Sequence, residues 1–152
     1  MPIDLDKLDL KLLTLLQQDG RMSWTQLGQA LGLTPPAAAD RASRLEKKGV
    51  IAGYAARLQP DAIGLHLTAF IDVTLEHPRA RHAFLKKVMA LKAIQECHHV
   101  AGDFDYLLKV RVGTTSDLEK LISEVLKSIP GVARTRTTIV LGTAKETAEL
   151  QP

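Results

Sequence analysis

The sequence predicts an α+β protein in which a helix-turn-helix unit precedes a four-stranded antiparallel sheet of βαββαβ order. Helical periodicity with start and stop signals fills the first third of the chain, and strand-like and helical patterns alternate after it. The segment PDAIG is the candidate boundary. We therefore expect domains at residues 1–59 and 65–142, a linker at 60–64 and a tail at 143–152.

Composition favours a packed protein. Hydrophobic residues make up 45% of the 152 residues, which excludes disorder, and a formal charge of +3 permits a nucleic-acid partner without indicating one. Cys97 is the single cysteine, which excludes an intramolecular disulfide and fits a reducing cytoplasm. No apolar run approaches the roughly 20 residues that span a bilayer. The start MPIDLDKLDLK is unlike a signal peptide, so we expect a cytoplasmic protein with no membrane partner.

The first two helices are expected at Asp6–Gln18 and Ser23–Ala30. Asp6 is the expected N-cap of the first, with Asp9 near the positive end of its dipole. Ser23 and Gln26 match a capping box that opens the second. Gly32 provides a tight exit, so a short helix, a turn and another helix follow in helix-turn-helix order.

The third helix is expected from Thr34 to Gly49, with Thr34 as N-cap and glycine as its end. Ala38, Ala42 and Leu45 form a narrow inward stripe at helical spacing. Small buried residues bring the helix close to its neighbours and leave the opposite face free to enter a groove, as in a recognition helix. The outer and flanking candidates for DNA contact are Thr34, Pro36, Ala37, Asp40, Arg41, Ser43, Arg44 and Lys47.

These candidates have alternative interpretations. Arg44 can make a bidentate contact with guanine, whereas a solvated helix face is the structural alternative. Arg41 lies toward the edge of the buried stripe, so a structural ion pair competes with a DNA contact. Ser23, Trp24 and Thr25 lie at a helix N-terminus, where phosphate binds readily, although Trp24 can equally be a packing residue.

After Gly49, the run VIAGYAARLQ predicts a short strand or a β-ribbon turning at Gly53, which forms a small wing or leads into the linker. A capping box of Ser116 and Glu119 is expected to open the last helix, which Pro130-Gly131 ends. The strands are expected at 65–75, 94–101, 106–112 and 132–141, and a helix at 78–91 buries Phe84, Leu85, Val88 and Met89.

Two helices cover one face of such a sheet. The other face, with Phe70 and the Thr-rich side of the last strand, is expected to meet a second subunit. Cys97 and His99 share one face of their strand and His98 points to the other, so the three cannot converge on a metal. The sequence contains no nucleophile elbow, phosphate loop or paired-cysteine motif, and we expect no catalytic residue, cofactor or metal.

The turn Gly102-Asp103-Phe104-Asp105 before Tyr106 has two interpretations. One is an ordinary β-turn, which Gly-Asp favours. The other is a small-molecule site, in which Asp105 pairs with an amino group and turn amides take a carboxylate. Thr135, Thr137 and Thr138 on the last strand would close the pocket.

Four segments in order resemble the Lrp/AsnC (feast/famine) transcriptional regulators: LDKLDLKLLTLLQQDGR, LGLTPPAAADRASRLEKKGVIAGYAA, VAGDFDYLLKVRV and IPGVARTRTTIVLGTAKET. The resemblance runs almost end to end. It implies a winged helix-turn-helix that binds double-stranded DNA and a ferredoxin-like (ACT-like) domain for effector binding and oligomerisation. It also implies homodimers formed mainly through the C-terminal sheets, often octamers of four dimers, with amino acids bound between dimers.

Two features depart from the family pattern. Ala38, Ala39 and Ala42 are smaller than the β-branched residues common there, and Pro35-Pro36 is less usual, which bears on DNA sequence preference. The ending KETAELQP and the GDFDY turn resemble the branch that responds to apolar or small amino acids.

We therefore expect a sequence-specific DNA-binding regulator modulated by an amino acid. One alternative is an architectural DNA-binding protein that needs no effector. Another is an enzyme similar to the sirohaem-type tetrapyrrole decarboxylases, which carry a histidine- and Phe-Asn-Leu-Trp-like run where this chain has GDFDYLLKV. The absence of that run argues against the enzyme.

Overall fold

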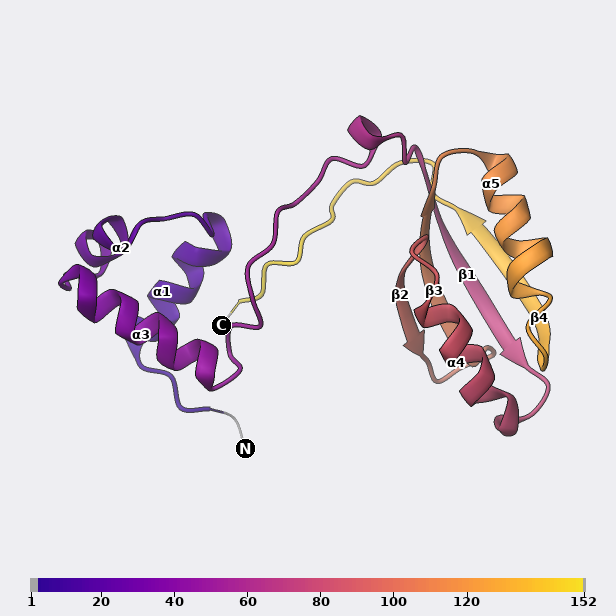
Figure 1. The fold of residues 1–152 in the computed structure, drawn as a ribbon, viewed down its shortest axis with the longest axis horizontal. Helices are drawn as coiled ribbons and strands as arrows, with labels where there is room; N and C mark the ends of the chain where they lie inside the picture. Colours follow the sequence, from indigo (N-terminus) through magenta and orange to yellow (C-terminus); the bar gives the residue numbers. More distant parts are fainter. Residues whose placement is uncertain (1–2, 152) are drawn as a thin grey trace. The chain divides into compact units, whose positions relative to one another are not determined.

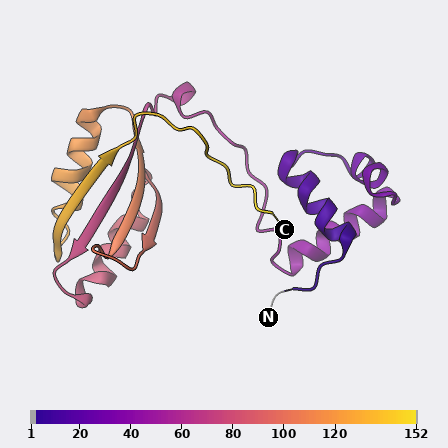
Figure 2. The ribbon, with the colours of Figure 1, turned by 180° about the vertical axis from the view of Figure 1, so that it is seen from behind.

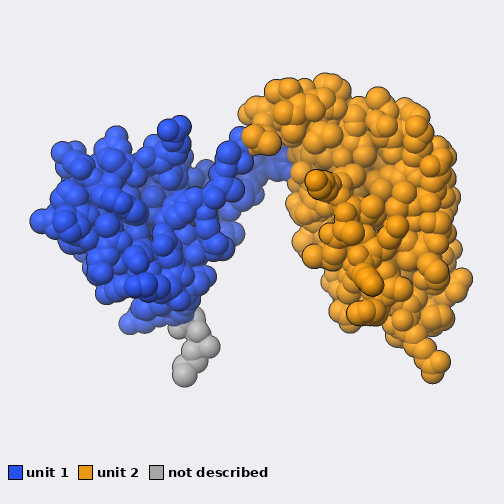
Figure 3. Space-filling model, in the orientation of Figure 1, with its two compact units in different colours: residues 1–57, 145–152 blue, residues 58–144 orange. Residues whose placement is uncertain are grey.

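The computed structural model describes residues 3–151, which form two compact units (Figures 1 and 3). The first unit holds the described residues up to Arg57 together with those from Lys145 onward, and the second spans Leu58–Ala144. The C-terminal tail therefore belongs to the first unit, although it follows the last strand of the second. No helix in the described part is long and apolar enough to cross a membrane.

Three helices build the first unit: α1 (Lys7–Gln18), α2 (Trp24–Leu31) and α3 (Pro35–Lys47). Each begins at the cap predicted for it, because the side chains of Asp6, Ser23 and Thr34 accept hydrogen bonds from first-turn amides. Gly32 takes the left-handed conformation, with φ of 69°, that ends α2. The helix-turn-helix prediction is confirmed.

The turn between α2 and α3 passes very close to α2 at Gly28. A Cβ built on Gly28 would lie 2.7 Å from the carbonyl oxygen of Leu33, a distance that real Cβ atoms do not reach. The amide of Leu33 also donates to the carbonyl of Gly28 at 2.8 Å. The angle between the two helices thus depends on a backbone contact that only glycine permits.

The expected wing is not formed. Residues 51–59 contain no strand, and Gly53 does not join two paired strands. Tyr54 instead donates a hydrogen bond from its hydroxyl to Glu46 Oε1 at 3.0 Å. Partial burial, followed by the interaction with Glu46, raises the pKa of Tyr54 to about 12. The segment after α3 is therefore held by a side chain rather than by a strand ladder.

The second unit contains β1 (Leu67–Leu75), α4 (Arg81–Met89), β2 (Ile94–His99), β3 (Tyr106–Val112), α5 (Thr115–Lys120) and β4 (Val132–Ile139). All strand pairs are antiparallel and the sheet order is β2-β3-β1-β4, as the βαββαβ pattern predicts. Both helices lie on one side of the sheet, and the reverse view in Figure 2 shows the opposite side without helices.

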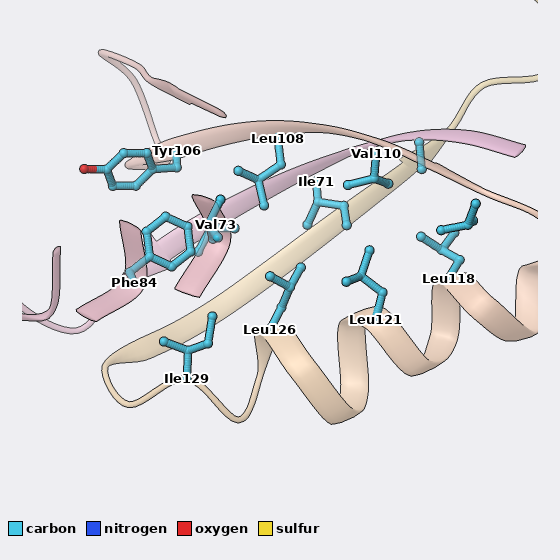
Figure 4. Close-up of a cluster of buried hydrophobic side chains, with 13 residues drawn as sticks. Ile71, Val73, Phe84, Tyr106, Leu108, Val110, Leu118, Leu121, Leu126 and Ile129 are labelled. Atoms are coloured by element: carbon cyan, nitrogen blue, oxygen red, sulfur yellow. The ribbon is translucent and has the colours of Figure 1, made fainter. Parts of the chain in front are cut away.

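The core lies between the sheet and its helices (Figure 4). Alternate residues of the two central strands face it, because successive side chains of a strand point to opposite faces. Phe84 and Val88 of α4 are buried as predicted, but Met89 is 79% exposed. The prediction for Met89 was wrong, because Met89 is the last residue of α4 and its side chain is open to solvent.

The last helix also begins at a different cap from the one predicted. Thr114 and Asp117, not Ser116 and Glu119, form the capping box. The helix continues as a π-helical segment, Leu121–Leu126, which buries Leu121 and Leu126. β3 ends at Val112, so the cap must lie within a residue or two of it, and the later Ser116 box falls inside the first turn.

Gly131 fixes the entry to β4. Its φ is 88°, a left-handed value that favours glycine, and a Cβ there would lie 2.2 Å from the Cβ of Ala80. Its carbonyl accepts a hydrogen bond from the amide of Glu76 at 2.8 Å. This contact joins the end of β1 to the start of β4 and sets their register.

Candidate nucleic-acid interface and ligand site

The outer face of α3 is open in the first unit. Ala38 and Ala42 are fully buried and Leu45 is 2% exposed, so the inward stripe is the predicted one. The side chains on the other side of the helix are solvent-exposed, except for the half-buried Ser43: Pro36, Ala37, Asp40, Arg44 and Lys47. A helix placed in this way can enter a major groove without rearrangement.

Arg41 differs from these exposed residues because it forms ion pairs with the N-terminal end of α1. Its Nη1 atom lies 2.5 Å from Asp6 Oδ2 and 2.6 Å from Asp9 Oδ1, and its side chain is 16% exposed. The Arg41 hydrogen bond, followed by the amide of Asp9, holds the pKa of Asp6 below its ordinary value of 3.8. The structural ion pair, one of the two alternatives, is therefore present, and Arg41 fixes α3 against α1.

The N-terminus of α2 presents polar groups to solvent. Ser23 and Gln26 form the predicted reciprocal capping box. Trp24 is 43% exposed and does not belong to the apolar cluster of the unit, so it is not buried filler. Thr25 and Thr34 are exposed as well. This end of α2 carries the partial positive charge of the helix dipole, which suits a phosphate group.

The turn before β3 has a structural role at Asp105. The Oδ2 atom of Asp105 accepts a hydrogen bond from the amide of Leu75 at 2.7 Å, and its own amide donates to the carbonyl of Val73 at 3.0 Å. The carboxylate thus completes the end of β1. Its other oxygen, Oδ1, has no hydrogen bond within residues 3–151. This oxygen can therefore accept a hydrogen bond from an amino group, as predicted for Asp105 from the sequence.

Phe104 and Tyr106 point to different environments. The guanidinium of Arg136 lies 4.5 Å from the ring centroid of Phe104 and hydrogen-bonds Asp72 at 3.0 Å. Tyr106 is 2% exposed and packs against Phe84 in the core. Its side chain therefore does not join the turn residues Gly102 and Asp103, which are exposed.

The three threonines of β4 do not converge. Thr135 and Thr137 lie opposite Val73 and Ile71, on the helix-covered face, whereas Thr138 lies opposite Phe70 on the other face. The expected closure of one pocket by all three was wrong, because strand alternation separates Thr137 from its neighbour. For the same reason the helix-free side of β4 presents Arg134, Arg136 and Thr138 rather than a Thr-rich surface.

Arg136 is the residue that sequence reasoning missed at this site. It joins β4 to Phe104 of the turn and to Asp72 of β1. A signal existed, because an arginine and an aspartate placed directly opposite each other on neighbouring strands form a favourable pair. Finding it required the β1–β4 register, which the sequence alone did not provide.

The histidines and Cys97 lie as the alternation predicts. Cys97 and His99 face the helices, opposite Leu108 and Tyr106, while His98 lies opposite Leu107 on the other face. His98 contacts Glu96 at 3.1 Å, and this contact, followed by that of Lys109, lowers the pKa of Glu96. Within residues 3–151, no group of three or more His, Cys, Asp or Glu side chains is placed to hold a metal ion.

Comparison with known proteins adds independent findings. The sequence model of the AsnC-type helix-turn-helix domain matches residues 5–46, and that of the Lrp/AsnC ligand binding domain matches residues 68–150. The leucine-responsive regulatory protein of Klebsiella pneumoniae is 43% identical over 149 residues, covering 97% of this chain and 91% of the relative. That of Escherichia coli K12 shows the same identity and coverage.

Two solved structures have a similar fold throughout. A transcriptional regulator from Neisseria meningitidis, in complex with L-Met, superposes with a TM-score of 0.93 at 32% identity, covering 97% of this chain and 96% of that one. The feast or famine regulatory protein of M. tuberculosis, complexed with L-methionine, superposes with a TM-score of 0.90 at 34% identity, covering 98% and 100%.

Proposed function

This chain belongs to the Lrp/AsnC family of transcriptional regulators, and from that premise we propose that α3 reads operator DNA while the second unit binds a free amino acid. The observation that carries the DNA assignment is the open outer face of α3 above a buried stripe of small residues. In this proposal the protein acts in the cytoplasm, and it works by binding DNA and an amino acid, without catalysis. The proposed contacts on α3 are Pro36, Ala37, Asp40, Ser43, Arg44 and Lys47.

We expect two kinds of DNA contact, one with base edges and one with backbone phosphates. Arg44 hydrogen-bonds a guanine edge in the major groove and provides sequence discrimination. Lys47, together with Ser23, Trp24, Thr25 and Thr34, holds phosphates and fixes the position of the helix. In a homodimer the two recognition helices meet successive major grooves about 34–36 Å apart.

A comparison of Arg44→Ala with Lys47→Ala tests this division. The Arg44 variant should lose about 1–3 kcal/mol of preference for the operator over random duplex. The Lys47 variant should weaken binding to both duplexes alike and reduce the salt slope by about one. Fluorescence anisotropy with the protein's own promoter region measures both. If the wild-type protein binds promoter and random duplex equally, operator recognition is refuted.

The effector proposal rests on the turn before β3. Asp105 Oδ1 is free to accept an amino group, and turn amides near the exposed Gly102 and Asp103 can take a carboxylate. The structures of the regulators from N. meningitidis and M. tuberculosis are complexes with L-methionine, which supports an apolar amino acid as effector here. Phe104 offers an apolar surface for such a side chain.

Asp105→Asn is the matched test. The amide oxygen of asparagine can still accept from Leu75, so the unliganded fold is kept, but the negative charge that attracts the amine is gone. In a thermal-shift screen over the natural amino acids, the effector should stabilise the wild-type protein by about 2.7 kcal/mol when it is present at a hundredfold excess over its Kd. The variant should lose that shift. If no amino acid stabilises the wild-type protein, an effector-independent architectural role is favoured instead.

We also propose that the helix-free sheet face is the dimer interface and that four dimers form an octamer. Phe70, 36% exposed, lies on that face beside Asp72 and opposite Lys109 and Thr138. Aromatic residues are enriched at the centre of protein–protein interfaces, and polar groups form the rim around them. Sedimentation of Phe70→Glu should give smaller assemblies than the wild-type chain. An unchanged mass would exclude this face.

A further inference from the structure

The segment His77–Gln95, which contains α4, is the most one-sided stretch of charge in the chain. It has no aspartate or glutamate. Its cations are Arg79, Arg81, Lys86, Lys87 and Lys92, and all of them are solvent-exposed. We call these side chains the α4 cationic surface.

Nothing in the described chain neutralises this surface. Within residues 3–151, none of these side chains takes part in a salt bridge. Two acidic residues flank the segment. Within residues 3–151 Glu76 takes part in no salt bridge, and Glu96 contacts His98 and Lys109 on the helix-free side of the sheet. The carboxylate of Asp117 accepts hydrogen bonds from Thr114 at the cap of α5.

Helix stability does not explain the whole pattern. Lys86 and Lys87 lie in the last turn of α4, where the helix dipole favours cations. Arg79 and Arg81 lie at the opposite end, where the dipole disfavours them, and no acidic residue occupies that first turn. A charge arrangement that opposes the local helix rule at one end indicates a role outside the fold itself.

A groove runs beside the C-terminal half of this surface. It is lined by Lys86 and Lys87 with Ala83 and Ala90 on one side, and by Ser128, Ile129 and Pro130 on the other. No carboxylate lines it, and the neighbouring Lys127 adds another exposed cation. The concave shape and the single sign of charge together fit a polyanionic backbone.

We propose that the α4 cationic surface is a second, sequence-neutral contact for duplex DNA, made by the ligand-binding unit with phosphates outside the operator. This inference rests on the proposed operator recognition by α3 and extends the bound length of DNA beyond it. Lysine and arginine side chains on phosphates contribute affinity through counterion release and carry no base preference. We assign DNA as the partner of this surface because, in the proposed function, α3 of the other unit already binds DNA.

The test uses the full chain and two operator duplexes. The short one, of about 25 base pairs, covers only two half-sites one helical turn apart. The long one, of about 80 base pairs, adds flanking DNA for further phosphate contacts. The variant is Lys86→Glu with Lys87→Glu. The matched control is Lys120→Glu with Lys145→Glu, which makes the same charge change at two exposed lysines that lie outside the α4 cationic surface and its groove.

The wild-type chain and the control should bind the long duplex about tenfold more tightly than the short one, and the Lys86/Lys87 variant should lose that advantage. Its salt slope on the long duplex should fall by about two. All three should bind the short duplex alike. Because glutamates add repulsion, Arg79→Gln with Arg81→Gln provides a second variant that only removes charge, and it should reduce the same advantage.

The two proposals fail in different ways. If the wild-type chain does not prefer its operator, operator recognition fails and this inference fails with it. If short-duplex binding is intact but both α4 variants keep the long-duplex advantage, this inference alone is overturned. Variants that keep that advantage but lose binding to an acidic protein or to anionic vesicles would likewise overturn it and assign the surface to that partner.

Discussion

The two units are stabilised in different ways. The apolar cluster of the first unit is small: Leu12, Leu31, Ala42 and Leu45 are buried in it, with partly buried residues around them. Its helices are also held by the Arg41 ion pairs and by the close backbone contact at Gly28. The second unit has a larger buried cluster that joins the sheet to both helices (Figure 4).

The difference has a physical consequence. The stabilisation from apolar burial does not depend on pH and is spread over many atoms. The stability of the second unit should therefore fall mainly when a substitution reduces the volume of a buried side chain. The first unit depends on a few polar and backbone contacts, so single changes that leave apolar area intact should weaken it. Substitutions in each unit can therefore distinguish the two kinds of stabilisation.

Phe84→Ala should lower the free energy of unfolding of the second unit by about 3–5 kcal/mol, because it removes a fully buried ring from the core. Met89→Ala, on the same helix but 79% exposed, should change it by less than about 0.5 kcal/mol. Urea unfolding followed by circular dichroism measures both. Equal effects of the two substitutions would show that α4 does not pack as described.

Gly28→Ala should destabilise the first unit by about 1–3 kcal/mol, although alanine ordinarily favours a helix. The reason is the 2.7 Å approach of the new Cβ to the carbonyl oxygen of Leu33. Gly20→Ala is the control, because its Cβ would meet nothing closer than 3.7 Å. Trp24 is the only tryptophan and lies in this unit, so its fluorescence reports the unfolding selectively. A stabilised Gly28 variant would contradict the packing.

The contrast also explains which features the sequence could predict. Caps and faces depend on spacing within one element, so Asp6, Ser23 and the buried stripe of α3 were predictable. The capping box of the last helix was misplaced because Thr114–Asp117 and Ser116–Glu119 both fit the pattern, and only the end of β3 decides between them.

In the candidate sites, too, some features follow from local sequence patterns and others depend on the tertiary structure. Strand alternation already separates Thr137 from Thr138, so that error was avoidable. The bond from Leu75 to Asp105 and the position of Arg136 above Phe104 join distant segments, and no local pattern indicates them. Arg41 had two possible partners, DNA or an acidic side chain, and only the packing of α1 against α3 brings Asp6 and Asp9 to it.

Arg41→Met should reduce the acid sensitivity of the first unit. The pKa of Asp6 in the folded chain lies below its unfolded value, chiefly because of the Arg41 hydrogen bond. The ionised carboxylate therefore contributes stability above about pH 4, and that contribution is lost as the pH falls through the lowered folded pKa.

In the variant, the slope of unfolding free energy against pH in this acid range should shrink by up to about one proton. Urea titrations of Trp24 fluorescence between pH 2.5 and 6 provide the measurement. Lys47→Met, which removes an exposed cation of the same helix, is the control and should keep the wild-type slope. An identical slope in Arg41→Met and the wild-type chain would mean that the ion pair contributes nothing to stability.

The smallest effect concerns the C-terminal tail, which is attached to the first unit through Gln17. The side-chain amide of Gln17 pairs with the backbone of Leu150 in both directions: Nε2 donates to the carbonyl at 2.9 Å, and Oε1 accepts from the amide at 2.7 Å. This is the pattern of two facing strands, made here by a side chain. It attaches the last residues of the chain to α1.

Gln17→Ala should cost the first unit less than about 1 kcal/mol, because both partners are exposed and water replaces the lost bonds. Its clear signature is local: amide hydrogen exchange at Leu150 should speed up, while exchange in α3 stays unchanged. Gln29→Ala, also an exposed glutamine-to-alanine change, should leave Leu150 unaffected. If exchange at Leu150 is the same in the wild-type chain and in both variants, the tail is free in solution. The first unit would then rely on its three helices alone, and its dependence on Arg41 and Gly28 would be greater still.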